Sequence, residues 1–374
     1  MEYQKFKLGK LLPYEQPTPY IVSSTDYNDS YETPVVTPGK SFILGYTNDK
    51  SGIYNKLPVI IFDDFTTQSK YVDFKFKVKS SAMKILTPNL TLVLPKYIFY
   101  RLQTIHIDHS THKRYWIQHY SKIVVDIPPI QEQKRIVSKI EELFSRLDAG
   151  VEKLKKTKTQ LAVYRQAVLK EAFSCCTEKK PIRNLSQFVT SGSRGWSAFY
   201  SDEGARFIRI TDLNRKGIEL NNNSIQYVRL PERAEGKRSR LQKGDVLVSI
   251  TADLGCIALI PENIGEAYIN QHIAMIRLNN PGYGKFMAWY LRSEWGQKDL
   301  LKNKRGGGKL GLGLDDIRET LVPVLEKEES NRILSFIDSR LSICNNIEYI
   351  IDTALQKIEF ARQSILKKAF DGKL

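Results

Sequence analysis

The sequence predicts a mixed α+β chain, in which two α/β globular domains alternate with two long helices that form an antiparallel coiled coil. Three observations predict this fold class. Residues 135–173 and 332–370 align without a gap at an offset of 197 residues, with 11 identities in 39 positions. Both segments carry apolar residues at helical spacing, and the regions between them contain strand-like apolar runs. The repeat indicates pseudo-twofold internal symmetry.

Both repeated segments are predicted to be helices of about 40 residues, or roughly 60 Å each at the rise of an α-helix. Their apolar residues are mostly three, four or seven positions apart, which is the spacing of a coiled-coil seam. Pro128-Pro129 and Pro323 suit helix starts, and Asp371-Gly372 suits a helix stop. The seam residues are Ile136, Ile140, Leu143, Leu147, Val151, Leu154, Leu161, Val168 and Ala172 in the first helix and Ile333, Ile337, Leu341, Cys344, Ile351, Ile358, Ile365 and Ala369 in the second.

Neither helix has an apolar face wide enough to be stable alone, so each needs a partner. The simplest partner is the other helix, and antiparallel pairing gives each globular block an equivalent place. Pairing with another protein, or with a second copy of the chain, is the alternative.

The globular blocks are predicted to be α/β with much strand, because short β-branched runs are bounded by turn residues such as Lys243-Gly244-Asp245. The predicted strands are Val59–Phe62, Phe207–Ile210, Val246–Ile250 and Ala274–Leu278, and Phe286–Leu291 is predicted to be a short amphipathic helix. The predicted organisation is a first domain at 1–130, a first helical repeat at 131–175, a second domain at 176–325 and a second helical repeat at 326–374.

Basic residues outnumber acidic ones, and the formal net charge of the 374-residue chain is +16. Residues 1–130 carry +5, 131–173 carry +4 and 174–325 carry +7, so the excess lies on folded blocks rather than in one basic tail. This distribution favours a polyanionic partner, because each neutralised phosphate releases counterions. A proteome that is basic throughout would give the same charge.

The cysteines and the first residues predict a cytoplasmic chain. Cys175, Cys176, Cys256 and Cys344 form no CxxC pair, as expected of a reduced protein. The first residues are polar and lack the apolar core of a signal peptide, and no apolar run approaches the length of about 18 residues that a membrane span needs. We therefore expect no membrane partner.

The order of domain, long helix, domain and long helix resembles the specificity subunit of type I restriction–modification enzymes. The resemblance covers essentially the whole chain. The similar segments are Pro58–Thr66 and Val78–Lys84 in the first block, Ser191–Trp196, Gly244–Gly255 and Gly265–His272 in the second, and Pro128–Gln133 at the start of the first helical repeat. Pro323–Glu328, at the start of the second repeat, departs from the family pattern because it lacks the Gln-Glu-Gln tail.

The resemblance implies a non-catalytic DNA-binding subunit. Each block would be a target-recognition domain that reads one half of an asymmetric, bipartite site in double-stranded DNA. The helices would dock methyltransferase subunits, two of them, and restriction subunits would join that core. The helices would then act as a ruler, with half-sites roughly 34 Å apart or somewhat more.

Two other functions are open from the residues alone. A coiled-coil nucleoid or regulatory protein, without a restriction partner and without strong sequence preference, would have the same charge and helices. An enzyme, either a DNA methyltransferase or a nuclease with an unrecognised site, is the second alternative.

The sequence contains no recognisable catalytic, cofactor or metal motif. Arg305–Leu310 is rich in glycine but lacks the residue order of a phosphate-binding P-loop. Asn280–Tyr283 mimics the Asn-Pro-Pro-aromatic wall of an amino-methyltransferase, but its third residue is glycine. His106, His109, His112 and His119 lie close together, yet no cysteine accompanies them and Lys113-Arg114 would repel a cation. We therefore predict no catalytic residue, no cofactor and no metal.

Candidate DNA contacts are cations beside glycines, aromatic residues or strand ends, because phosphates need cations and close backbone amides, and base edges need polar side chains. The strongest cluster is Lys302–Lys309, and its counterpart before the first helix is His112–Trp116. Solvated loops or, for Trp196, a core position are the alternatives. The residues predicted to contact DNA are Lys302, Lys304, Arg305, Gly307, Lys309, Lys113, Arg114, Tyr115, Arg194, Trp196, Arg209, Arg238 and Arg240.

Two further groups of polar residues have candidate roles. Asp63-Asp64 can accept hydrogen bonds from cytosine amines, or can simply cap a turn. Arg165 and Gln166 recur as Arg362 and Gln363 beside the apolar seam, and we predict that these four residues bind partner subunits. The alternative is that their stems seal the coiled coil.

Overall fold

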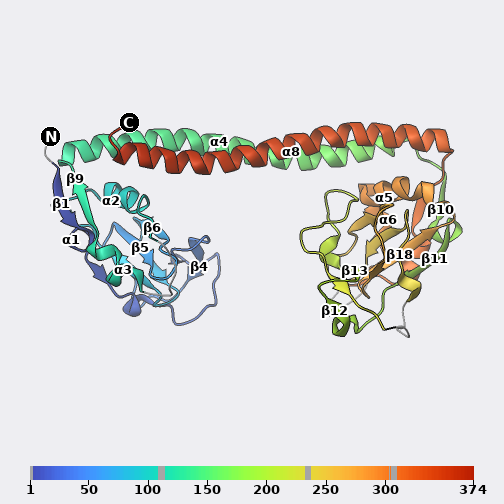
Figure 1. The fold of residues 1–374 in the computed structure, drawn as a ribbon, viewed down its shortest axis with the longest axis horizontal. Helices are drawn as coiled ribbons and strands as arrows, with labels where there is room; N and C mark the ends of the chain where they lie inside the picture. The colour runs from blue at the N-terminus through green and yellow to red at the C-terminus, as the bar shows by residue number, and fades with distance from the viewer. Residues whose placement is uncertain (1–2, 108–113, 232–236, 303, 305–309) are drawn as a thin grey trace. The chain divides into compact units, whose positions relative to one another are not determined.

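The computed structural model describes residues 3–107, 114–231, 237–302, 304 and 310–374. The chain divides into two compact units: unit 1 comprises residues 1–154 and 353–374, and unit 2 comprises residues 155–352. Each unit contains one globular domain and a part of both long helices, α4 (Ile130–Ala172) and α8 (Lys327–Phe370), which are drawn in Figure 1. The mixed α+β fold with two long helices is therefore confirmed.

α4 begins where the prolines predict, and α8 ends where the glycine predicts. α8 begins at Lys327, four residues after Pro323, because Pro323 instead ends strand β19 (Leu321–Pro323). α4 starts directly after Pro129 and runs for 43 residues, and α8 runs for 44 residues. After α8, Gly372 has a φ of +70°, which glycine adopts without strain. The backbone N–H groups of Asp371 and Lys373 donate to carbonyl oxygens of the last turn at 2.9 and 2.8 Å. The last turn is therefore closed by hydrogen bonds, as the Asp-Gly stop predicts.

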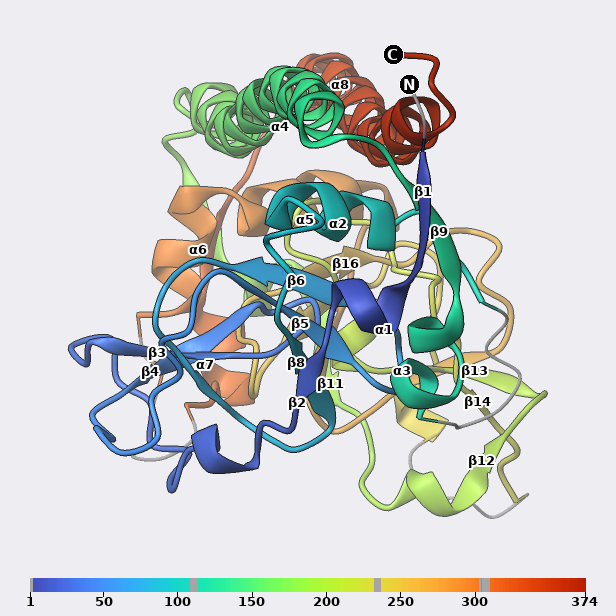
Figure 2. The same ribbon diagram turned by 90° about the vertical axis from the view of Figure 1, so that its left-hand side faces the viewer.

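In unit 1, the first part of α4 packs antiparallel against the last part of α8. Asp148 of α4 pairs with Arg362 of α8, and Arg135, nearer the start of α4, donates to the carbonyl oxygen of Leu374 at 3.2 Å. Figures 1 and 2 show helix α2 (Pro95–Leu102) between this helix pair and the sheet of the domain. The residues of the two long helices that are buried in the core of unit 1 are Ile136, Val137, Ile140, Leu366 and Ala369.

The unit 1 domain contains a four-stranded sheet of order β2-β8-β5-β6, a three-stranded sheet of order β4-β3-β7 and the pair β1-β9. The predicted strand at 59–62 is confirmed as the buried central strand β5. The elements are β1 (Gln4–Lys7), α1 (Leu8–Leu11), β2 (Tyr14–Glu15), η1 (Thr18–Tyr20), β3 (Thr33–Val36), β4 (Ile43–Thr47), β5 (Val59–Asp63), β6 (Ser69–Val72), β7 (Lys77–Val78), β8 (Met83–Leu86), α3 (Tyr115–Gln118), η2 (Tyr120–Lys122) and β9 (Val124–Ile127).

In unit 2, the last part of α4 packs antiparallel against the first part of α8. Lys158 pairs with Asp352 at 2.5 Å, and Arg165 donates to the side-chain oxygen of Asn345 at 2.6 Å. The core of the unit joins these helices to helix α5 (Gly284–Arg292) of the domain, as its counterpart in unit 1 joins them to α2. The buried residues contributed by the long helices are Val168, Leu169, Ala172, Ile333, Ile337 and Leu341.

The unit 2 domain contains two four-stranded sheets, β11-β18-β15-β16 and β12-β14-β13-β17, and the pair β10-β19. The predicted strands at 246–250 and 274–278 are confirmed as β15 and β18. The elements are β10 (Lys179–Pro181), η3 (Ile182–Asn184), β11 (Ser186–Ser191), η4 (Trp196–Phe199), β12 (Tyr200–Ser201), β13 (Ala205–Ile208), η5 (Ile210–Asp212), β14 (Tyr227–Val228), η6 (Lys237–Ser239), β15 (Val246–Ser249), β16 (Ile257–Leu259), β17 (Ala267–Ile269), β18 (Ile273–Leu278), η7 (Pro281–Tyr283), α6 (Glu294–Leu300), α7 (Leu314–Glu319) and β19 (Leu321–Pro323).

The predicted strand at 207–210 ends earlier than the sequence indicates. β13 stops at Ile208, and the 3-10 helix η5 follows from Ile210. The carboxylate of Asp212 accepts the backbone N–H of Arg209 at 2.8 Å, which turns the chain out of the sheet. The apolar spacing gave no sign of this capping interaction.

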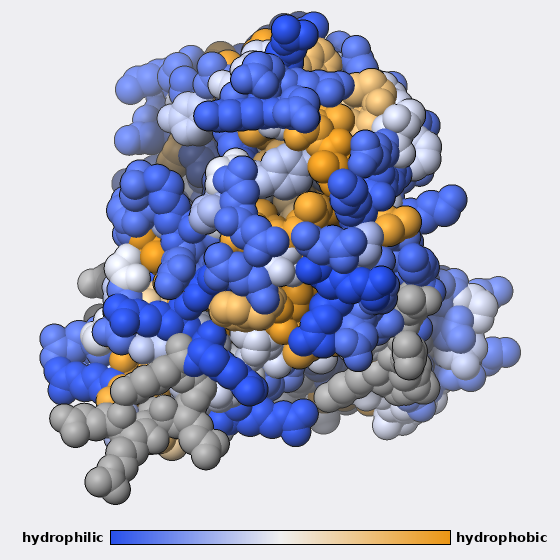
Figure 3. All heavy atoms as spheres, turned by 90° about the vertical axis from the view of Figure 1, so that its right-hand side faces the viewer, coloured by the Kyte–Doolittle hydropathy of each residue, from blue (hydrophilic) through white to orange (hydrophobic). Residues whose placement is uncertain are grey.

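The surface of unit 2 is mainly hydrophilic on the face drawn in Figure 3, with smaller apolar areas between the hydrophilic residues. Large apolar side chains that are exposed in this unit include Phe188, Trp295 and Leu321. Within the described part of the chain, no helix combines the length and apolar composition that a membrane span needs.

Candidate nucleic-acid interface

An open hollow of about 780 Å³ lies among three loops of the unit 2 domain. It is lined by residues of the segment after β11, of η6, and of the connection between β17 and β18. Arg194 and Arg238 both line it, and both side chains are exposed. The structure therefore brings together two cations that the sequence predicted separately. A concave surface with two exposed guanidinium groups suits phosphate oxygens or the acceptor edge of guanine.

The loop that carries Arg194 is held in place by two glycines and one tryptophan. A Cβ atom on Gly192 would lie 1.9 Å from the last carbonyl oxygen of β17, so only glycine permits this close approach. Gly195 has a φ of +79° and turns the chain into η4. Trp196 is only 4% exposed and packs in the core against Phe207, with ring centroids 5.6 Å apart. Trp196 thus occupies the core position that was the alternative, and it anchors the loop from inside.

Gln271 lines the same hollow and was missed by the sequence analysis. Its side-chain nitrogen lies 2.9 Å from Nε2 of His272, and Nδ1 of His272 lies 2.6 Å from the hydroxyl of Thr251. Because an amide nitrogen only donates, His272 accepts at Nε2 and carries its proton on Nδ1. These bonds orient the Gln271 amide, whose oxygen and second N–H match the edge of adenine. A polar Asn-Gln-His triplet between two apolar strands was the available sequence signal.

Arg209 and Arg240, two further predicted contacts, interact within the unit 2 domain. The guanidinium group of Arg209 donates to the carbonyl oxygen of Ser224 at 3.0 Å. The backbone carbonyl of Arg240 accepts from Arg277 at 2.7 Å, while the Arg240 side chain is exposed. Neither side chain lines the hollow of Arg194, and their contact with DNA stays a prediction.

The predicted basic, glycine-rich segment is described only in part. Lys302 and Lys304 are exposed, and Lys302 pairs with Asp299 at 2.8 Å. After the segment, Gly311 forms a β-bridge with Thr251, the residue that contacts His272 beside the hollow. Arg305, Gly307 and Lys309 lie outside the described residues.

In unit 1, the turn between β5 and β6 presents an exposed aromatic ring. The carboxylate of Asp63 accepts the backbone N–H groups of Phe65 and Thr66, each at 2.8 Å, which fixes the turn. Phe65 lies at the tip of this turn and is 48% exposed. Asp63 therefore caps a turn, which was the alternative to reading cytosine. Phe65, which the sequence analysis missed, is the side chain that this turn presents.

Asp64, the next residue of this turn, ties three segments of unit 1 together. Its carboxylate pairs with Lys84 of β8 at 3.2 Å and accepts the backbone N–H of Trp116 at 2.8 Å. The Asp64 and Lys84 side chains are only 3% and 5% exposed. Because a buried charge without its partner is costly, the ion pair locks β8 to the β5–β6 turn, and the hydrogen bond from Trp116 attaches α3 to the same carboxylate. This ion pair therefore joins residues 58–66 to residues 78–84, the two segments of the first block in which the sequence resemblance was found.

The predicted aromatic and basic cluster before the first long helix is divided between surface and core. Arg114 is exposed. Tyr115 is buried, and its backbone N–H donates to the carbonyl oxygen of Asp64 at 3.0 Å. Lys113 lies outside the described residues.

The four predicted partner-binding residues of the long helices have unequal environments. Arg165 is 9% exposed and donates to Asn345 at 2.6 Å and to Glu348 at 3.1 Å. Arg362 pairs with Asp148, and its guanidinium carbon lies 4.9 Å from the ring centroid of Phe144. Both arginines thus contact the opposite helix, which agrees with the sealing role that was the alternative. Gln166 and Gln363 are exposed.

Several apolar side chains on the outside of the long helices were not singled out from the sequence. The seam spacing does not predict them, because they lie on the polar face of the helices rather than along the seam. Large exposed apolar side chains on a helix are a feature of surfaces that bind other proteins. These residues are Val163, Tyr164, Ile343, Ile347, Tyr349 and Ile350 in unit 2 and Phe360 in unit 1.

Comparisons with known proteins point to one family. The family model described as type I restriction modification DNA specificity domain matches residues 1–159. The chain is 31% identical over 372 residues to the EcoR124I/EcoR124II type I restriction enzyme specificity subunit of Escherichia coli, covering 93% of this chain and 89% of that protein. It is 26% identical over 285 residues to the EcoBI specificity subunit of Escherichia coli, covering 67% of this chain and 58% of that protein.

A solved structure shows the same fold. It is a chain from a study of complex assembly and conformational transition of the type I R-M system, and it is 16% identical to this chain. The match covers 100% of this chain and 98% of that chain, with a TM-score of 0.70.

Proposed function

Because the chain belongs to the specificity subunits of type I restriction enzymes, we propose that its two domains each read one half of a bipartite, asymmetric site in double-stranded DNA. One duplicated contact carries this proposal. Lys96 of α2 pairs with Glu141 of α4 in unit 1, and Lys285 of α5 pairs with Asp338 of α8 in unit 2. The two acidic residues are 197 positions apart, which is the offset of the repeat. Each domain is thus attached to the helices by an equivalent short helix.

The charge and the loops of the units support two unlike readers. Each unit carries a net charge of +8, half of the total of +16, so each can neutralise phosphates by itself. The side chains offered to DNA differ, because unit 1 presents Phe65 on a hairpin turn and unit 2 presents Arg194 and Gln271 in a hollow. Unlike side chains read unlike base edges, and the two half-sites should therefore differ in sequence.

The long helices supply the surface for protein partners in this proposal. Their exposed apolar side chains would bind methyltransferase subunits, two of them, and restriction subunits would join that complex. The chemistry would belong to those partners, with this chain as a non-catalytic subunit acting in the cytoplasm. The helices would also serve as a ruler, because a continuous helix keeps a fixed length for the spacer between the half-sites.

Genomic methylation mapping tests the proposal directly. Methylated positions are mapped in the source cell with the gene intact, deleted, and restored on a plasmid. The expected result is a bipartite consensus that disappears on deletion and returns on complementation. Methylation that is unchanged by deletion, or DNA binding by the assembled complex without any bipartite consensus, would contradict the proposal.

A purified complex separates the role of this chain from that of its partners. Labelled methyl transfer to DNA is measured for the chain alone, for the methyltransferase subunits alone and for the mixture. We expect transfer only from the mixture. Transfer by the isolated chain would show that it is an enzyme.

A further inference from the structure

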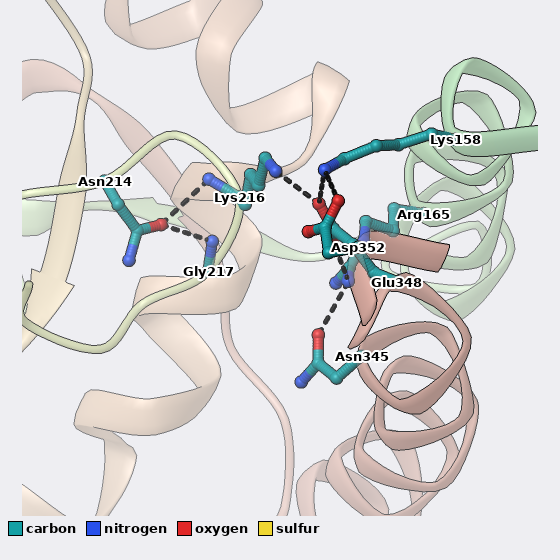
Figure 4. A network of polar contacts seen from close by, with 8 residues as sticks. All are labelled: Lys158, Arg165, Asn214, Lys216, Gly217, Asn345, Glu348 and Asp352. Atoms are coloured by element: carbon teal, nitrogen blue, oxygen red, sulfur yellow. Dashed lines mark hydrogen bonds and ion pairs between the residues drawn. The ribbon is translucent and has the colours of Figure 1, made fainter. Parts of the chain in front are cut away.

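Glu348 of α8 is surrounded by three cations of unit 2 (Figure 4). Its carboxylate lies 3.1 Å from the guanidinium group of Arg165 and 3.8 Å from the ammonium group of Lys158, both on α4. It also pairs with Lys216, which belongs to the domain rather than to the helices. Glu348 is therefore a single carboxylate that joins both long helices to the domain.

Lys216 is held by its own loop. The side-chain oxygen of Asn214 accepts the backbone N–H groups of Lys216 and Gly217 at 2.8 and 2.7 Å. This Asx turn fixes the backbone from which the lysine side chain extends, as Figure 4 shows. A lysine on a fixed turn loses less conformational freedom when it binds Glu348 than one on a free loop would.

The Lys216–Glu348 contact is a second attachment of the domain to α8. The first is the contact of α5, where Lys285 pairs with Asp338 above the apolar core. The two acidic residues are ten positions apart, or about 15 Å along the helix. Between them lies a hollow of about 760 Å³, lined by Asp338 and Glu348 on the helix side and by Lys216 on the domain side. The lysine therefore spans an open space rather than a packed interface.

This second attachment is not part of the repeated scaffold. At the repeat offset of 197, Asp338 corresponds to Glu141, which makes the equivalent ion pair in unit 1. Glu348 corresponds to Val151, which has no carboxylate. The first attachment is thus common to both domains, and the second belongs to unit 2.

We infer that Lys216 is a positioning residue for the second half-site: through Glu348 it fixes the angle at which the unit 2 domain is held on its part of the long helices. The inference rests on the proposed function, because an angle matters only if the domain reads DNA at a set place. A second attachment away from α5 restrains rocking of the domain about α5. Lys216 itself touches no DNA in this account.

A distance measurement tests the positioning without DNA. Spin labels are placed on exposed residues of β11 and α8, at Gln187 and Asn346, in a full-length chain whose exposed Cys175 is changed to serine. We expect the label-to-label distance distribution to broaden in Lys216→Ala and to return to the original width in Lys216→Arg. Lys243→Ala is the matched control, because Lys243 is an exposed lysine of the same domain whose partner, Glu262, also lies in the domain. An unchanged distribution in Lys216→Ala would overturn the inference.

A binding measurement tests the consequence for DNA reading. The assembled complex is given duplexes with both half-sites and a spacer of native length, or one base pair shorter or longer. In Lys216→Ala the preference for the native spacer should fall by up to about fivefold, the range of a partly exposed ion pair. Lys216→Arg and Lys243→Ala should keep the preference, although Lys243→Ala loses the same charge.

The outcomes separate this inference from the proposed function. If the unaltered complex shows a bipartite site but Lys216→Ala keeps the full spacer preference, the inference is wrong and the proposed function stands. If Lys243→Ala loses the preference equally, general charge and not position explains the effect, which also overturns the inference. If the unaltered complex shows no bipartite site, the proposed function itself fails, whatever the spin labels report.

Discussion

Changing Asp64 to asparagine should destabilise unit 1 by about 3 kcal/mol, because it leaves Lys84 as a buried charge without a carboxylate. The two side chains are 3% and 5% exposed and lie 3.2 Å apart. Removing one member of such a pair costs about 3–5 kcal/mol. We expect the lower end, because Lys84 keeps its contact with the side-chain oxygen of Gln16 at 3.2 Å and asparagine can still accept from Trp116. With an m-value of about 2 kcal/mol/M, the urea midpoint should fall by about 1.5 M.

Hydrogen exchange in urea, resolved by peptide, measures unit 1 and unit 2 separately. The design compares Asp64→Asn, Lys84→Met and the double variant. Because the two residues share one interaction, the double variant should lose less free energy than the sum of the single losses. Peptides of unit 2 should exchange as before. A shift of less than about 0.5 M for Asp64→Asn, or fully additive losses, would refute the account of Asp64 as the residue that locks the β5–β6 turn.

Three further predictions concern unit 2. Arg194→Ala should weaken specific DNA binding about tenfold and relax base selectivity only at the second half-site. The control Arg183→Ala removes a cation outside the hollow and should change neither property. Equal losses in the two variants would contradict the hollow as a site that reads DNA. Among the four cysteines only Cys175 is exposed, and burial raises the pKa of Cys176 to about 12. A maleimide at pH 8 should therefore modify one thiol of the folded chain rapidly and all four thiols only in denaturant. The pKa of Glu348 is lowered by Lys216, Arg165 and Lys158, so the contribution of this carboxylate to stability is present above the unfolded pKa of about 4.3 and is lost as pH falls through the lower folded pKa. The urea midpoint of unit 2 should therefore fall between pH 5 and 3 by a larger amount than in Glu348→Gln. Equal slopes in the two proteins would exclude a stabilising role for the Glu348 carboxylate.

The long helices were predictable because their signals are local and repeated. Apolar residues at coiled-coil spacing, prolines before the helices and Asp371-Gly372 after the second one each depend on a few neighbours in sequence. The seam residues Ile140, Ile337 and Ile351 are buried as the spacing predicts. The strands at the centre of each domain were predictable for the same reason, because β5 and β15 are short apolar runs between turns.

The candidate DNA contacts were predictable only in part, because composition does not say which side of a loop a residue faces. Trp196 and Arg194 are two residues apart and share one basic, aromatic sequence segment, yet the tryptophan is in the core and the arginine is exposed. Gln271 and Phe65 depend on contacts that the sequence does not display, which are the hydrogen bond to His272 and the turn closed by Asp63. Such positions are decided by tertiary packing rather than by local pattern.

The repeat and the antiparallel pairing of the helices are two aspects of one physical requirement. In a parallel, in-register pair each residue faces its own copy, so Arg165 would face Arg362 and the two cations would repel. In the antiparallel pair each arginine instead faces the position 17 residues earlier in the other repeat: Arg165 contacts Asn345, and Arg362 contacts Asp148. The repeat offset of 197 carries one contact onto the other, because it relates Arg165 to Arg362 and Asp148 to Asn345. A duplicated helix that carries a cation at a fixed place therefore avoids this like-charge contact when it pairs with its copy in the opposite direction, and the reversal gives each domain an equivalent attachment to the helices.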